Sequence, residues 1–184
     1  MMKTARAGWT VALAGIVWAA GVYAYDFSAD MVMTHGGGKQ TGKIFVSGEK
    51  ARVETQDTVS ISRADRKVVW ILMPGQKTYM EMAFQPGSVP VEKDAGQIEK
   101  VLVGKDIVDG KPASKYRVTY AAGKEKTSVF QWFLESDGFP VKTEALDGSW
   151  SQEYRNIKRG NQPADLFEIP AGYSKFSMPA LPGR

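Results

Sequence analysis

The residues best suited to chemistry in this sequence form a run rich in glycine and lysine. Residues 37–43 read Gly-Gly-Lys-Gln-Thr-Gly-Lys, which matches the first part of a phosphate-binding loop. The next residue is Ile44, where the motif needs a serine or threonine hydroxyl for magnesium, and residues 44–46 read as a strand rather than a helix. The run therefore predicts no nucleotide site.

The sequence lacks most of the side chains that metal binding and nucleophilic catalysis require. His35 is the only histidine, and the chain has no cysteine to supply a thiolate or a soft metal ligand. Carboxylate pairs, Glu92 with Asp94 and Glu135 with Asp137, lie in predicted turns, where solvated charge is the ordinary explanation. The sequence thus predicts a protein that is not an enzyme and uses no metal or cofactor.

The N-terminus has the pattern of an export signal. Lys3 and Arg6 precede an apolar stretch over residues 7–21, and residues 22–24, Val-Tyr-Ala, form a cleavage site of the small-x-small kind. We expect a signal peptide over residues 1–24, cleavage after Ala24 and a periplasmic mature protein. The alternative is a retained membrane anchor, but the stretch is short for a span of about 20 residues, so we expect no stable transmembrane anchor.

Net charge and cysteine content exclude further classes of partner and of membrane anchor. The formal charge of +4 falls to +2 once Lys3 and Arg6 are removed, which is too weak to indicate a nucleic-acid partner. Without cysteine there is no disulfide and no lipoprotein anchor. The mature chain of about 160 residues must be held by its apolar core and its backbone hydrogen bonds.

The elements that would position any site are strands. Short runs rich in Val, Ile, Phe, Tyr and Trp alternate with turn residues about every ten positions, and Asp-Gly pairs at 109–110, 137–138 and 147–148 favour hairpins. Eleven strands are predicted, at residues 26–34, 42–46, 50–56, 58–63, 67–73, 77–84, 100–108, 113–120, 126–134, 140–146 and 149–158. The predicted fold class is mainly β, with a single antiparallel sheet.

Two segments break this pattern. Residues 85–97 contain Pro86-Gly87, Pro90 and a charged stretch, which predicts a crossover or lid with one or two helical turns. A second short helical turn is expected at residues 163–166, before a closing segment over residues 167–176. We therefore expect one β domain over residues 25–176 and a flexible, proline-rich tail over residues 177–184.

The centre of the sheet is apolar on both faces. Residues 68–73 read Val-Val-Trp-Ile-Leu-Met, whereas a strand with one wet face would alternate apolar and polar residues. Methionines, which fill irregular apolar surfaces, recur in these strands. Ordinary core packing explains the pattern most simply, and an apolar ligand is the alternative.

Several motifs, in order, resemble one family. Residues 50–54, Lys-Ala-Arg-Val-Glu, are followed at the family's spacing by Ile61, Asp65, Lys67, Trp70 and Pro74, and residues 163–173 resemble its closing segment. Residues 132–133, 140–142, 154–157 and 166–170 look like an uncharacterised branch of the same group. The chain resembles the LolA/LolB-like periplasmic lipoprotein-localisation superfamily.

This resemblance implies an open half-barrel whose concave apolar face is covered by short helices and accommodates acyl chains. The candidate residues for such a hydrophobic cavity are Trp70, Leu72, Met80, Met82, Phe130 and Trp132. One feature departs from the localisation factors, which begin with an amphipathic helix, whereas residues 25–27 lead directly into a strand.

Two functions follow as hypotheses. The first is a periplasmic binding or carrier protein for a lipid or another amphiphile, with an acyl-chain ligand. The second is a protein-interaction or envelope-sensing module on the same fold, with an envelope protein as its partner.

Overall fold

Twelve strands make up one sheet in the part of the chain that the computed structural model describes, residues 25–84, 97–122 and 125–176. The strands are β1 Phe27–His35, β2 Gly38–Ser47, β3 Lys50–Glu54, β4 Val59–Arg63, β5 Val68–Met73, β6 Thr78–Ala83, β7 Gln97–Val108, β8 Lys111–Ala122, β9 Glu125–Leu134, β10 Pro140–Ala145, β11 Trp150–Arg159 and β12 Ser174–Lys175. Single turns of 3-10 helix follow β4, β5 and β11, at Ala64–Arg66, Pro74–Gln76 and Ala164–Phe167.

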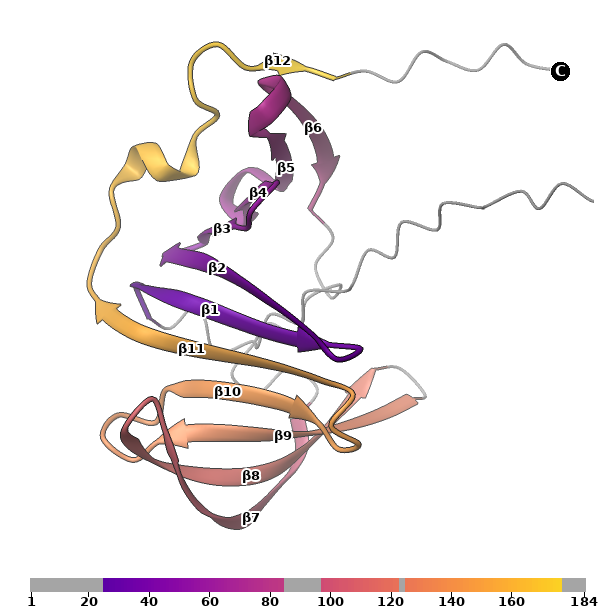
Figure 1. The fold of residues 1–184 in the computed structure, drawn as a ribbon, viewed down its shortest axis with the longest axis vertical. Helices are drawn as coiled ribbons and strands as arrows, with labels where there is room; N and C mark the ends of the chain where they lie inside the picture. Colours follow the sequence, from indigo (N-terminus) through magenta and orange to yellow (C-terminus); the bar gives the residue numbers. More distant parts are fainter. Residues whose placement is uncertain (1–24, 85–96, 123–124, 177–184) are drawn as a thin grey trace, which may run out of the picture.

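The sheet consists of two antiparallel meanders that join at β1. Its strand order is β12-β6-β5-β4-β3-β2-β1-β11-β10-β9-β8-β7, so that β1 pairs with both β2 and β11 (Figure 1). The short β12 pairs with β6 in parallel, and all other neighbours are antiparallel. One edge of the sheet is therefore capped by β12, and the other edge is formed by β7.

The sheet is open and curled. The turn between β7 and β8 returns to β11, where the backbone N–H of Asn156 donates to Oδ2 of Asp109 over 3.0 Å. Two strands, β10 and β9, separate β11 from β8, so in a flat sheet even the nearer end of this turn would lie about 14 Å from β11. Contact across this span requires strong curvature, and the predicted fold class of a curved, open antiparallel sheet is confirmed.

The eleven predicted strands are present, with shifted ends. The largest shift is in β2, which begins at Gly38 rather than Gly42, so the run that resembles a phosphate-binding loop forms a hairpin and a strand. Gly36 and Gly37 have positive φ values of 56° and 81° in that hairpin, a conformation that glycine adopts without strain. The helical turn expected at residues 163–166 appears at Ala164–Phe167, whereas the signal peptide, most of the predicted lid and the tail lie outside the described residues.

The buried apolar side chains of the sheet form two clusters. The larger one surrounds the β1–β11 junction, where Phe27, Phe139 and Tyr154 stack edge-on or tilted with centroids 4.9 to 6.2 Å apart. The smaller one lies on β4 and β5, where Val59, Ile61, Trp70 and Leu72 pack against Phe167.

The smaller cluster is covered by residues 163–176, which we call the C-terminal strap. Two arginines attach it to the sheet: Nη1 of Arg52 donates to the Leu166 carbonyl over 2.9 Å, and Nη1 of Arg63 donates to the Phe167 carbonyl over 3.1 Å. Arg63 also donates to the Asp65 carboxylate through Nε and Nη2, and to the Glu168 carboxylate through Nη1. A buried guanidinium with this many acceptors fixes the strap in one position.

Candidate functional site

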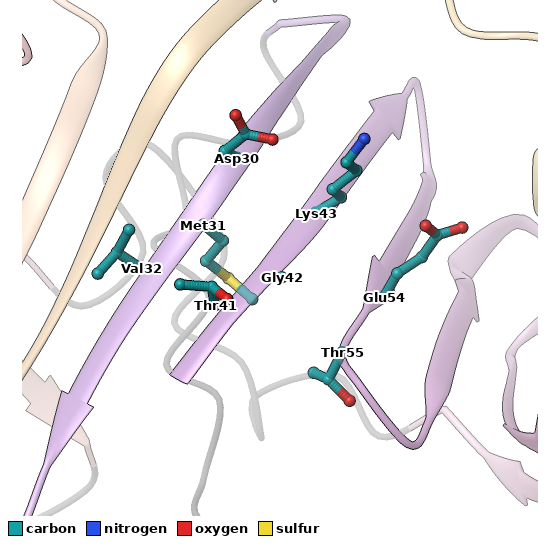
Figure 2. A pocket seen from close by; sticks show the side chains of 8 residues that line it. All are labelled: Asp30, Met31, Val32, Thr41, Gly42, Lys43, Glu54 and Thr55. Carbon is teal, nitrogen blue, oxygen red and sulfur yellow. The ribbon is translucent and has the colours of Figure 1, made fainter. Parts of the chain in front are cut away.

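A hollow of about 460 Å³ lies on the middle of the sheet, where β1, β2 and β3 meet (Figure 2). Its lining consists of Asp30, Met31, Val32, Thr41, Gly42, Lys43, Glu54 and Thr55. Three charged and two hydroxyl side chains contribute to this lining, but most of its exposed surface is apolar. The hollow therefore suits a ligand that combines apolar and polar groups.

Unequal strand lengths produce this hollow. β2 has ten residues and pairs with β1 along its whole length, but β3 pairs with β2 only from Lys43 to Ser47. Beyond Glu54 the chain turns away, with Thr55 and Thr58 hydrogen bonded to each other. Residues 38–42 therefore have no strand on their second side among the described residues, and we call this stretch the open edge of β2.

Gly42 allows β3 to approach at the end of this edge. A Cβ atom at position 42 would lie 2.3 Å from the Glu54 carbonyl oxygen and 3.6 Å from Cε of Met31. The first distance is far inside van der Waals contact with a backbone atom, so no other residue type fits without a shift of β3. The glycine that resembled part of a nucleotide motif is thus needed for packing.

Three charges cross the hollow on one face of the sheet. Asp30 is opposite Lys43, and Lys43 is opposite Glu54, so all three side chains project from the same face. Asp30 accepts from Nδ2 of Asn156 over 2.7 Å, and Glu54 forms an ion pair with Arg52 at 2.7 Å. The two carboxylates are thereby held in place by neighbouring groups, with the exposed Lys43 between them.

The six residues predicted from the sequence do not come together at this hollow. Trp70 and Leu72 are buried beneath the C-terminal strap. Glu81 is the residue of β6 that lies opposite Trp70 and shares its face of the sheet. Met80 and Met82, on either side of Glu81, therefore project from the opposite face. Phe130 and Trp132 lie in the other meander, so the six residues occupy three separate places.

Phe130 and Trp132 belong to a cluster of aromatic and cationic groups that the sequence reading missed. The Lys115 ammonium lies 4.0 Å from the Phe130 centroid and 4.5 Å from that of Trp132, and the Lys142 ammonium lies 4.4 Å from Trp132. Nε1 of Trp132 donates to Oδ2 of Asp106 over 2.9 Å, and this bond lowers the pKa of that carboxyl. The lysines are cross-strand partners of Trp132, a relation set by strand register.

The outermost strand exposes apolar side chains. On β7, the side chains of Ile98, Leu102, Val103 and Ile107 are each more than half exposed. Ile98 and Val103 lie at two irregularities where the register with β8 shifts. An exposed patch of this kind indicates an interaction surface.

Metal binding and membrane spanning by a helix find no support in the described residues. No group of three or more histidine, aspartate or glutamate side chains among them is placed to hold a metal ion. Within the same residues, no helix is long and apolar enough to cross a bilayer.

Comparison with known proteins identifies the fold. The crystal structure of MucB superposes with a TM-score of 0.55 at 16% identity, covering 83% of this chain and 60% of MucB. The complex of Pseudomonas aeruginosa MucA and MucB gives a TM-score of 0.54 at 17% identity, covering 83% and 58%. The chain has a MucB-like fold, which supports the predicted LolA/LolB-like architecture. It spans about three fifths of the MucB length.

Other comparisons are weaker. A family model described as a domain of unknown function, DUF4412, matches residues 88–173, just under half of the chain. A DUF1329 family protein from Desulfovibrio piger gives a TM-score of only 0.38 at 14% identity, covering 78% of this chain and 90% of that protein, which is too low to argue a common fold. No curated protein matches the sequence.

Proposed function

We propose that this chain is a non-enzymatic binding module of the periplasm that holds an extended segment of a partner protein along the open edge of β2. The observation that carries this proposal is that, among the described residues, no strand pairs with the second side of residues 38–42, beside a hollow of about 460 Å³. Backbone N–H and C=O groups along such an edge are ready to pair with an added strand. The hollow would receive the side chains of that strand.

Charge indicates what kind of segment would fit. Lys39, Thr41 and Lys43 alternate with Gln40 and Gly42 along β2, so the two lysines project from the same face as the hollow's threonine. An added strand would place every second side chain beside them. A segment with acidic residues at alternate positions is the complement of this face.

The comparison with MucB agrees with this proposal. MucB has been crystallised in complex with MucA, so a protein of the same fold takes a protein partner. Export to the periplasm is part of the proposal and is supported by the N-terminal sequence.

Site-directed photo-cross-linking in the producing cell would test the site. A photoreactive phenylalanine at Thr41 should give a discrete adduct, and the same group at the exposed Thr127 on β9 serves as the control. Mass spectrometry identifies the partner, and a synthetic peptide of the cross-linked segment is then titrated calorimetrically. We expect Thr41→Trp, which fills the hollow, to weaken peptide binding at least about tenfold, while Thr127→Trp leaves it unchanged.

Two results would contradict this function. The same adduct from both positions would show that the contact is not made at the open edge of β2. Equal peptide affinity for wild type and Thr41→Trp would exclude the hollow as the place where the side chains bind.

Carriage of an amphiphile stays a competing prediction. Its six candidate residues line no common hollow among the described residues, and Trp70 and Leu72 are already covered by Phe167. Native mass spectrometry of the exported protein would separate the two functions. A co-purifying acyl species in a protein whose mass begins at Tyr25 would favour the carrier, and an empty protein would favour the peptide-binding module.

A further inference from the structure

The outermost strand β7 has an amphipathic face that the proposed peptide site does not use. Leu102 is 57% exposed and Ile107 is 72% exposed. Their cross-strand partners on β8, Tyr116 and Pro112, place both on one face of the sheet. Large aliphatic side chains this exposed on a monomer mark a contact surface.

Lysines alternate with these aliphatic residues on the same face. Lys100 is opposite Val118 and Lys105 is opposite Ser114, so both project from the face of Leu102 and Ile107. The two acids of the strand, Glu99 and Asp106, are opposite Thr119 and Ala113 and belong to the other face. Lys105 forms an ion pair with the neighbouring Glu135 at 3.1 Å.

Aromatic rings extend this face inward from the edge. The Lys100 ammonium lies 3.6 Å from the Phe133 centroid and 4.4 Å from that of Tyr116, and these two rings meet edge-on at 5.6 Å. Partial burial among them lowers the pKa of Lys100. The face thus combines aliphatic side chains, lysines and aromatic rings, the composition of surfaces that lie in a membrane interface.

We infer that this face, formed by Lys100, Leu102, Lys105 and Ile107 with Tyr116 and Phe133, docks on the surface of an anionic lipid bilayer. The aliphatic side chains would enter the headgroup region, and the lysine ammoniums would lie beside lipid phosphates. Backbone groups on the outer side of β7, which pair with no other described strand, stay hydrated at this depth, which the hydrocarbon core would not permit.

The strand itself favours a lipid surface over a second copy of the chain. Two register irregularities, after Gln97 and after Leu102, interrupt the regular edge that an added strand needs. Two antiparallel self-pairings of β7 centred beside Val103 would keep matching faces together, and one of them would place Lys100 opposite Lys105 and Glu99 opposite Asp106. Like charges directly opposite each other destabilise such a pair.

Vesicle co-sedimentation tests this inference with the exported protein, its N-terminus established by intact mass. We expect binding to phosphatidylcholine vesicles that contain about one third phosphatidylglycerol, and weak binding to pure phosphatidylcholine. The double variant Leu102→Ser/Ile107→Ser should lower the partition coefficient at least about tenfold. Leu146→Ser is the matched control, because Leu146 is similarly exposed at 47% but lies after β10.

The remaining outcomes decide against the inference. Equal binding by the double variant and wild type, or an equal loss in Leu146→Ser, would show that β7 is not the docking face. Self-association in sedimentation velocity that disappears in the double variant, with no vesicle binding, would identify a second copy as the occupant. Circular dichroism confirms that each variant is folded, and cross-linking at Thr41 tests the peptide site separately.

Discussion

The two edges of the sheet differ in how much of their apolar surface is covered. On the β6 side, the chain returns as the C-terminal strap, adds β12 and covers the cluster around Trp70 with Phe167. On the β7 side, the strand ends the sheet with several large aliphatic side chains exposed. Packing beneath the strap therefore stabilises the β6 edge, whereas, among the described residues, β7 leaves its side chains accessible to other molecules.

The largest effect should come from removing the ring that the strap buries. Phe167→Ala is expected to lower the free energy of unfolding by about 3–5 kcal/mol, since Phe167 is fully buried among β4 and β5 side chains. Phe176→Ala removes the same side chain from the exposed end of the strap and should cost less than about 0.5 kcal/mol. Urea unfolding measures both, and similar losses would mean that Phe167 does not anchor the strap.

A smaller loss is expected when the strap loses its main polar attachment. Arg63→Met leaves the Phe167 carbonyl, Asp65 and Glu168 without their shared donor, at a cost of about 2–3 kcal/mol. Arg66→Met is the control, because Arg66 also pairs with Glu168 but is half exposed, and it should cost less than about 1 kcal/mol. A larger effect for Arg66 would contradict this assignment of the attachment.

The open edge of β2 can be compared with β7 by adding a single methyl group to each. Gly42→Ala should cost about 1–3 kcal/mol, because its Cβ would overlap the Glu54 carbonyl. Gly104→Ala on β7 meets nothing within 4 Å and should change stability by less than about 1 kcal/mol, with a gain expected from reduced backbone entropy. Equal losses, measured by thermal unfolding, would show that Gly42 is not a packing requirement.

The smallest effect is the pH dependence of the attachment that Arg63 makes between the sheet and the strap. The hydrogen bond from Arg63 lowers the pKa of Asp65 below its usual 3.8. Burial raises the pKa of Glu168, but bonds from Arg63 and Arg66 outweigh this and leave it below its usual 4.5. A carboxyl with a lowered folded-state pKa stabilises the fold above its unfolded pKa, and this stabilisation is lost as the pH falls through the folded value.

The pH prediction is checked by comparing Tm between wild type and Arg63→Met. Wild type should lose its advantage as the pH falls below about 4.5 and then through the lowered values of Glu168 and Asp65. Both carboxyls are partly exposed, so the change should be modest. A difference in Tm that stays constant down to pH about 3 would show that these carboxylates do not contribute.

Much of the fold could be predicted from local pattern. Alternating apolar runs and the Asp-Gly turns identified eleven strands, because strand and hairpin preferences act over a few residues. β12 was not predicted, because a strand of two residues that pairs in parallel with β6 has no local sequence pattern. The export signal and the tail lie outside the described residues and stay predictions.

The six candidate site residues stay a prediction, and Trp70 and Trp132 show what the sequence could not tell about them. Both were chosen as apolar residues on central strands, and both are buried. The sequence could not indicate that Phe167, far along the chain, covers the first, or that Lys115 and Lys142 lie over the second. Such contacts depend on strand order and register, which local periodicity does not encode.

The sequence by itself therefore determined the class of this protein: a mainly β chain whose apolar runs and turns specify an antiparallel sheet, without disulfides. Tertiary structure alone decided where the sheet stays open, because that depends on β3 ending at Glu54 while β2 continues to Gly38. It also decided that β12 caps one edge and β7 forms the other. Pairing between distant segments selects which edges and faces remain accessible, and a binding function depends on those surfaces.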